Sequence, residues 1–184
     1  MKILMVVGSL RKNSFNRALA EKAAELLEGK AEVSFLRYDD IPFMNQDIES
    51  PVPAEIARVR EEVMSSDGVW FFSPEYNHCF SGVLKNLLDW LSRPLVPGNY
   101  ASGTAIAGKK TAISGAAGKS AAAFSREKLR ELLVQIRAEV LKEETGIALG
   151  PDSFASDKLI LTDEEAASLA RQAEAFTAFL GQKE

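Results

Sequence analysis

The N-terminal stretch KILMVVG, residues 2–8, is followed directly by SLRKNSFNRAL, residues 9–19. A short run of branched apolar residues is typical of a strand buried on both faces of a parallel sheet. The polar residues after Gly8 then lead into a helix, predicted over residues 14–27 from the spacing of its apolar positions and the stop signal at Gly29. This strand, turn and helix predict the first unit of an α/β fold.

The same alternation continues along the chain. Further strands are predicted over residues 31–37, 67–75, 109–115 and 138–141, and further helices over residues 54–64, 82–92, 120–137 and 163–180. Residues 39–53 and 93–110 are expected to be loops. Five strands alternating with five helices predict one α/β domain with a parallel sheet and right-handed crossovers.

Composition excludes several classes of function. The 184 residues suit a single domain, and 22 Lys and Arg against 26 Asp and Glu give a net charge of −4, which argues against nucleic acid and anionic membranes as partners. The first apolar run is too short for a signal or a membrane span. Cys79 and His78 are the only residues of their kinds, so we expect no disulfide and no metal site, and a cytoplasmic protein.

The turn after the first strand suits a phosphate group. A helix N-terminus offers unpaired N–H groups and the positive end of the helix dipole. Ser9, Ser14 and Asn16 add short side-chain donors, and Arg11 adds a cation. The alternative is that Ser14 or Asn13 only caps the helix while Arg11 is solvated. Because the glycines of a dinucleotide-binding turn are missing, a terminal monophosphate fits better.

Two later loops lie at the same edge of the predicted sheet, where open α/β proteins bind ligands. SPEYNHCFSGVLKN, residues 73–86, offers backbone amides and the aromatic plane of Tyr76. SGAAGKS, residues 114–120, is small enough for its backbone to approach a ring edge closely. A planar heterocycle is the ligand that these loops predict.

Three stretches resemble the signatures of the NADPH-dependent FMN reductase family of quinone, chromate and azo-dye reductases: GSLRKNSFNRALA (residues 8–20), SPEYNHCFSGVLKNLLDWLSRP (73–94) and AGKKTAISGAAG (107–118). The similarity continues through ALGPDSFASDKLILTDEE at residues 148–165. The resemblance implies a flavodoxin-like fold with strand order 2-1-3-4-5 over residues 1–184, and non-covalent FMN. It also implies reduction by NADPH or NADH, a small-molecule acceptor, and a homodimer or homotetramer with the flavin near the subunit contact.

The resemblance further implies the FMN-binding residues. They are Ser9, Arg11, Ser14, Phe15 and Asn16 in the first loop, Pro74, Glu75, Tyr76 and Asn77 in the second, and Ser114, Gly115 and Ala116 in the third. No residue is expected to act as a nucleophile, because hydride chemistry belongs to the flavin. His78, Cys79, Phe80 and Ser81 depart from the family pattern, which bears on the acceptor more than on FMN.

Other interpretations of the same residues remain open. A non-enzymatic FMN electron carrier like a flavodoxin is the main alternative. A phosphatase loop around Cys79 lacks its arginine, since Lys85 stands six residues later, and a P-loop ending at Lys119 lacks its first glycine, since Ile113 stands there. The apolar helix over residues 82–92 carries more apolar surface than one core-facing stripe needs, which predicts a subunit contact. No clamp for a 2′-phosphate stands out, so the donor is NADPH or NADH.

Overall fold

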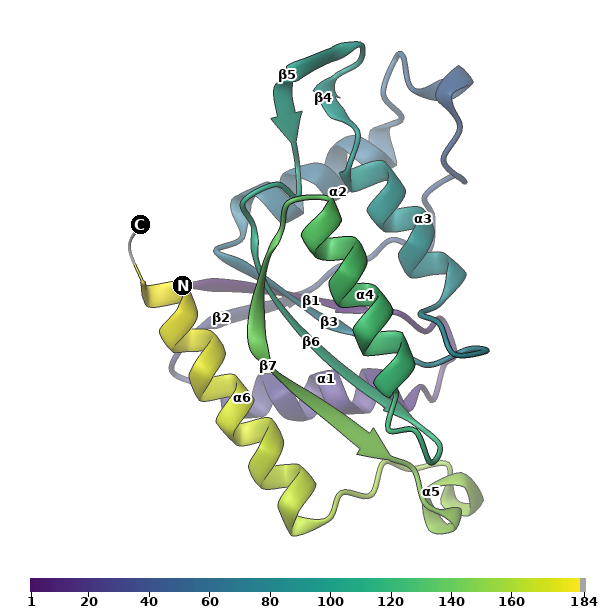
Figure 1. Ribbon diagram of the computed structural model, residues 1–184, viewed down its shortest axis with the longest axis vertical. Helices are drawn as coiled ribbons and strands as arrows, with labels where there is room; N and C mark the ends of the chain where they lie inside the picture. The colour runs from purple at the N-terminus through teal and green to yellow at the C-terminus, as the bar shows by residue number, and fades with distance from the viewer. Residues whose placement is uncertain (183–184) are drawn as a thin grey trace.

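The apolar run at the N-terminus forms β1 (Lys2–Val7), the second strand of a five-stranded parallel sheet in the computed structural model, which describes residues 1–182. The other strands are β2 (Glu32–Phe35), β3 (Gly68–Phe72), β6 (Lys110–Ala117) and β7 (Glu139–Ala148). Their order is β2-β1-β3-β6-β7. Counted within this sheet, the order is 2-1-3-4-5, so the predicted flavodoxin-like topology is confirmed (Figure 1).

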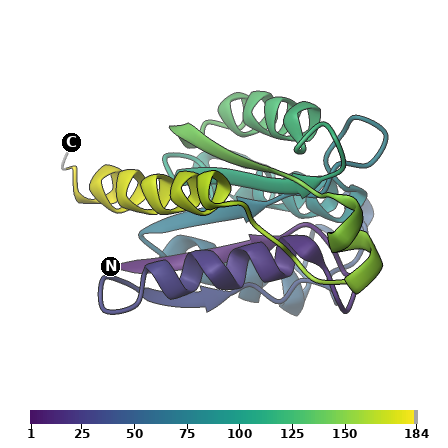
Figure 2. The same cartoon turned by 90° about the horizontal axis from the view of Figure 1, so that it is seen from below.

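Helices cover both faces of the sheet, which explains why β1 is apolar at successive positions. α1 (Phe15–Leu26) and α6 (Asp163–Gly181) pack on one face, where Ile3 and Met5 point. α2 (Ala54–Ser65), α3 (Gly82–Leu91) and α4 (Ala123–Gln135) pack on the other, where Leu4 and Val6 point. Figure 2 shows the sheet between α4 on one side and α1 with α6 on the other.

Three elements differ from the sequence prediction. β7 runs from Glu139 to Ala148, well beyond the predicted residues 138–141, because its register shifts at an irregularity and then continues alongside β6. Part of the predicted loop at 93–110 forms an antiparallel hairpin of β4 (Pro94–Val96) and β5 (Asn99–Thr104), which projects at the top of Figure 1. A 3₁₀ turn, η1 (Gln46–Ile48), lies in the predicted loop at 39–53.

The apolar surplus of α3 is buried within the chain, so the inference of a subunit contact from it was wrong. Leu84, Leu87, Leu88, Trp90 and Leu91 are all buried in a single copy of the protein. The reason is that this helix packs between the sheet and the polar segment before α2: Asn86 and Trp90 both donate to the carbonyl of Pro42, at 2.9 and 2.8 Å. The apolar surplus therefore gives no information about oligomeric state.

None of the helices in the described residues is both long and apolar enough to cross a membrane.

Candidate functional site

The candidate site is a pocket of about 380 Å³ at the carboxyl end of the sheet, on the loops that follow β1, β3 and β6. The chain reverses direction across the sheet between β1 and β3, and such switch points are where open α/β sheets bind ligands. A short helix, α5 (Pro151–Ser156), closes one side. The lining residues are Ser9, Arg11, Ser14, Phe15, Asn16, Pro74, Glu75, Tyr76, Ala116, Ala117, Gly118, Leu149, Phe154 and Asp157.

The first loop presents the N-terminus of α1 to this pocket. Ser14 is the N-cap, and its Oγ accepts from the backbone N–H of Arg17 at 3.2 Å. The first turn of α1 contains no acidic residue, so the positive end of the helix is not neutralised locally. The capping alternative and the phosphate hypothesis are therefore compatible: Ser14 caps the helix with its oxygen and retains its O–H as a donor.

Asn16 connects the first loop to the third. Its Nδ2 donates to the carbonyl of Ala116 at 3.0 Å, and its Oδ1 accepts from the Ala116 N–H at 2.9 Å. The pairing of β3 with β6 ends at Phe72 and Ser114. Beyond that point, the Asn16 side chain provides hydrogen-bond partners for the backbone of β6. Asn16 lines the pocket, but its side-chain amide is occupied by this structural contact.

Arg11 is half-exposed, and its guanidinium already has partners within the protein. Its Nη2 forms an ion pair with Asp157, and its Nη1 donates to the carbonyl of Asn13 at 2.6 Å. Hydrogen bonds from Arg11 and Asn13 lower the pKa of Asp157 below the ordinary carboxyl value. The guanidinium also lies 5.4 Å from the ring centroid of Phe15. Asp157 is 146 residues away in sequence, and sequence reasoning did not identify it.

The second loop is held in shape by α4. Ser73 Oγ and Ser125 Oγ are 2.7 Å apart, Ser125 also donates to the Pro74 carbonyl at 2.8 Å, and the Ser125 N–H donates to Glu75 at 3.2 Å. Glu75 therefore anchors this loop to α4 as well as lining the pocket. These contacts fix Pro74 and Glu75 at the pocket wall.

A tight turn follows, closed by two backbone hydrogen bonds between Tyr76 and Cys79. Asn77 and His78 occupy the turn with φ of 52° and 58°, a left-handed conformation that asparagine and histidine tolerate better than most residues. This turn leaves Tyr76 52% exposed at the pocket rim. Asn77 is not among the lining residues, and His78 stacks on Phe124 with centroids 4.2 Å apart.

The third loop begins later than predicted. β6 extends to Ala117 rather than stopping at residue 115, so Ala116, Ala117 and Gly118 line the pocket while Ser114 and Gly115 do not. Ser114 is fully buried, accepting from Trp70 at 2.9 Å and donating to Gln172 at 2.8 Å.

The packing around residue 115 requires a glycine. A Cβ there would lie 2.6 Å from the carbonyl oxygen of Ser73.

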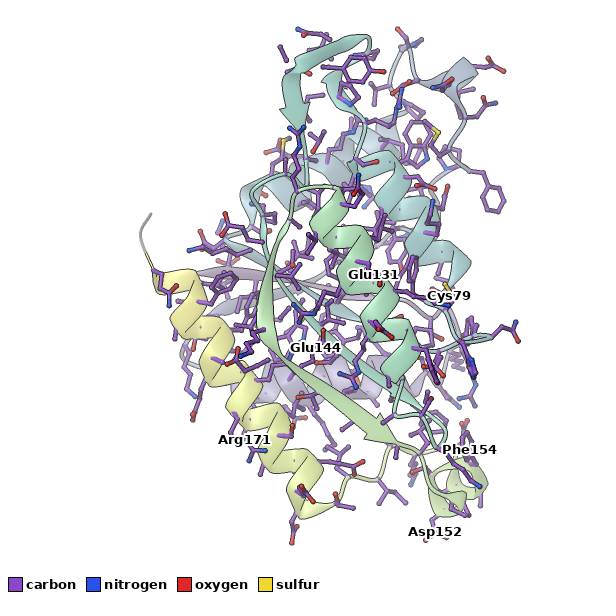
Figure 3. The ribbon with its side chains drawn as sticks, viewed as in Figure 1. Cys79, Glu131, Glu144, Asp152, Phe154 and Arg171 are labelled. Atoms are coloured by element: carbon purple, nitrogen blue, oxygen red, sulfur yellow. The ribbon has the colours of Figure 1, made fainter. Side chains whose placement is uncertain are left out.

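The segment around α5 contributes three of the pocket residues that the sequence analysis missed, besides Ala117 and Gly118. Phe154 packs edge-on against Phe15 with centroids 5.8 Å apart, and Leu149 and Asp157 flank it at the pocket. Figure 3 shows Phe154 on α5 at the lower right, below Cys79 of the loop after β3 on the same side of the view. Gly150 followed by Pro151 at the first helical turn was an available signal for this helix.

A helix N-terminus, a capping serine, an arginine and backbone amides around a hollow at the switch point define an α/β protein that binds a mononucleotide. The chain belongs to the NADPH-dependent FMN reductase family, whose model matches residues 1–151.

Individual relatives agree with this membership. An NAD(P)H-dependent FMN reductase of Pseudomonas aeruginosa is 32% identical over 178 residues, covering 95% of this chain and 92% of that protein. An NAD(P)H:quinone oxidoreductase of Solanum tuberosum is 32% identical, covering 90% and 84%. Among solved structures, the flavoenzyme NAD(P)H:acceptor oxidoreductase FerB of Paracoccus denitrificans superposes with a TM-score of 0.84 at 28% identity, covering 97% and 96%.

The donor set of the pocket fits the family's cofactor. FMN carries one terminal phosphate and a planar ring, and the pocket has a cationic, amide-rich end at α1 and an aromatic rim at Tyr76. The protein is accordingly an oxidoreductase that uses FMN, with NAD(P)H as the electron donor.

Proposed function

We propose that the pocket holds FMN with its phosphate at the N-terminus of α1 and its ring between the second and third loops. The donors to the phosphate are Ser9, the Ser14 hydroxyl, the first backbone N–H groups of α1 and Arg11. The single observation that carries the proposal is that three loops far apart in sequence bring most of the predicted ligands into one pocket.

The ring end is proposed to use different groups. Pro74, Glu75 and Tyr76 form one wall, and Ala116, Ala117 and Gly118 form another, joined to the first loop through Asn16. Amide N–H groups near the carbonyl edge of a flavin stabilise the charge of its reduced form. Asn77, Ser114 and Gly115 support the shape of these loops and are not part of the proposed ligand set.

We propose that quinones are the main electron acceptors, with azo dyes, chromate and free flavins as the wider range. Bound FMN supplies hydride acceptance from NAD(P)H and electron donation to an acceptor. The protein itself holds the flavin ring and leaves one side of it accessible to substrates. The half-exposed Tyr76 at the rim supports entry of planar acceptors there, because aromatic rings stack on one another.

A turnover assay tests this function against the electron-carrier alternative. FMN-loaded protein should oxidise NADPH or NADH steadily in the presence of 1,4-benzoquinone, at a rate well above that of the same concentration of free FMN. A flavin that binds and gives the usual protein-bound absorbance spectrum, but turns over nicotinamide no faster than free FMN, would favour a carrier. Protein that binds no FMN would refute the assignment of the pocket.

A homodimer or homotetramer stays a prediction that only the family resemblance supports, since α3 no longer argues for it. Light scattering over a range of concentrations decides the matter, and a mass near 20.1 kDa at every concentration would contradict it.

A further inference from the structure

A second hollow, of about 790 Å³, lies at the carboxyl ends of β1 and β2 beside α1. We call it the basic groove after its four cationic residues, Arg11, Lys12, Arg17 and Arg37. It shares Ser9 and Arg11 with the flavin pocket, so the two hollows adjoin. One ligand with two separated ring systems can therefore extend across both.

The charge of the basic groove is opposite to that of the whole chain. Its four cations face two carboxylates, Glu21 and Asp39, whereas the protein carries a net charge of −4. A concentration of positive charge on an acidic protein favours a ligand with more than one negative charge.

Two of the cationic side chains have hydrogen-bond donors available for such a ligand. Arg37 uses its Nε to contact Asp39 at 3.1 Å, and within residues 1–182 its two terminal nitrogens have no protein acceptor. Lys12 forms no salt bridge within the same residues. Both side chains are on the surface, where a phosphate can reach them. Paired donors of this kind suit phosphate oxygens.

The groove also has a platform for a planar base. The guanidinium carbon of Arg17 lies 3.9 Å from the ring centroid of Phe35, which holds the guanidinium against the phenyl ring. Nε of Arg17 donates to Glu21 at 2.8 Å and fixes its orientation further. The Arg17 side chain is 46% exposed, so the guanidinium face turned away from Phe35 is open to stack on a purine.

From these features we propose that the basic groove binds the adenosine 2′-phosphate end of NADPH. The inference rests on the proposed function, because the nicotinamide end of the same molecule must reach the flavin pocket. Lys12 and Arg37 hold the 2′-phosphate, and Arg17 stacks on the adenine. NADH lacks the 2′-phosphate, so the groove makes NADPH the preferred donor.

The test uses a probe without nicotinamide. Adenosine 2′,5′-bisphosphate is titrated into FMN-loaded protein by calorimetry, with adenosine 5′-monophosphate and inorganic pyrophosphate as comparisons. We expect the bisphosphate to bind more tightly than either. The Lys12→Ala/Arg37→Ala variant should bind it about 10- to 100-fold more weakly, because each charge-assisted hydrogen bond to a phosphate strengthens binding by about 10-fold. Lys128→Ala, which removes an exposed lysine on α4, should bind it within about twofold of wild type.

A further variant tests the stacking, and a steady-state assay tests the donor preference. Arg17→Lys keeps the charge but removes the planar group, so it should weaken binding of the bisphosphate and leave pyrophosphate unchanged. In steady-state assays, Lys12→Ala/Arg37→Ala should raise KM for NADPH with little effect on KM for NADH.

Three results would overturn the proposal. The first is equal affinity for pyrophosphate and the bisphosphate. The second is a loss of bisphosphate affinity in Lys128→Ala equal to the loss in Lys12→Ala/Arg37→Ala. The third is no bisphosphate binding at all. The FMN absorbance spectrum and NADH turnover are measured on the same samples. If both are normal while the bisphosphate fails to bind, the groove assignment is wrong and the proposed function stands; if both fail, the proposed function itself is wrong.

Discussion

Replacing Arg11 by alanine should weaken FMN binding and leave riboflavin binding unchanged. Riboflavin has the same ring without the phosphate, so the comparison isolates the phosphate contact. A charge-assisted hydrogen bond contributes roughly 1.5 to 3 kcal/mol, which corresponds to about 10- to 150-fold in affinity. The lower part of this range is expected, because the Nη2 of Arg11 already contacts Asp157 and the phosphate must replace or share that contact.

A substitution of Asp157, the ion-pair partner of Arg11, should change FMN affinity in the opposite direction. Asp157→Asn removes a carboxylate from the pocket wall and releases Arg11, so FMN should bind more tightly while riboflavin does not change. Both ligands are titrated into apo-protein by quenching of flavin fluorescence, with Lys128→Ala as a surface control. Equal losses for FMN and riboflavin in Arg11→Ala, or no loss for either, would refute the placement of the phosphate at the first loop.

Three other substitutions test the supporting structure and the chemistry. Asn16→Ala leaves both backbone groups of Ala116 without their partner and should lower the free energy of unfolding by about 2 to 4 kcal/mol in urea titrations; an effect no larger than that of exposed Asn13→Ala would contradict this. Gly115→Ala places a Cβ against the Ser73 carbonyl and should cost about 1 to 3 kcal/mol of stability, unlike Gly118→Ala, whose Cβ meets nothing within 4 Å; equal thermal stability of the two variants argues against it. Cys79→Ser should retain most quinone reductase activity, because flavin chemistry needs no thiolate; complete loss with FMN still bound would reopen a nucleophilic role.

The strands β1 and β3 were predictable because each carries its own signal, whereas the order of the sheet was implied by the family resemblance. Residues 3–7 and 69–72 are apolar at successive positions, which indicates burial on both faces, and each strand is followed by a helix with a clear apolar stripe. The end of β6 was not predictable in the same way. The stretch GAAG, residues 115–118, contains no polar or bulky residue that marks where a strand stops. Pairing with β7 and the Asn16 amide extend the strand to Ala117.

The missed part of the site depends on contacts between distant segments. Phe154 and Asp157 meet Phe15 and Arg11 only after α5 folds back over the first loop. A local pattern cannot report such a contact. Composition also cannot show whether an apolar helix faces the core or a partner subunit. The helix α3 has more apolar residues than one core-facing stripe needs, yet the segment around Pro42 and the sheet together bury it.

The contacts around the pocket divide into two kinds, and this division indicates which wall is fixed before a ligand binds. Buried hydrogen bonds join Asn16 of the first loop to Ala116 of the third, and Ser73 of the second loop to Ser125 of α4; such buried polar contacts are costly to break. By contrast, α5 and the residue after it meet the first loop at the surface, through the Phe154–Phe15 contact and the ion pair of Arg11 with Asp157. The side chains of that ion pair are 50% and 37% exposed, and exposed ion pairs are weak. A phosphate entering at α1 therefore meets three preorganised loops and one wall that yields at low cost, so adjustment on binding should be confined to Arg11 and α5.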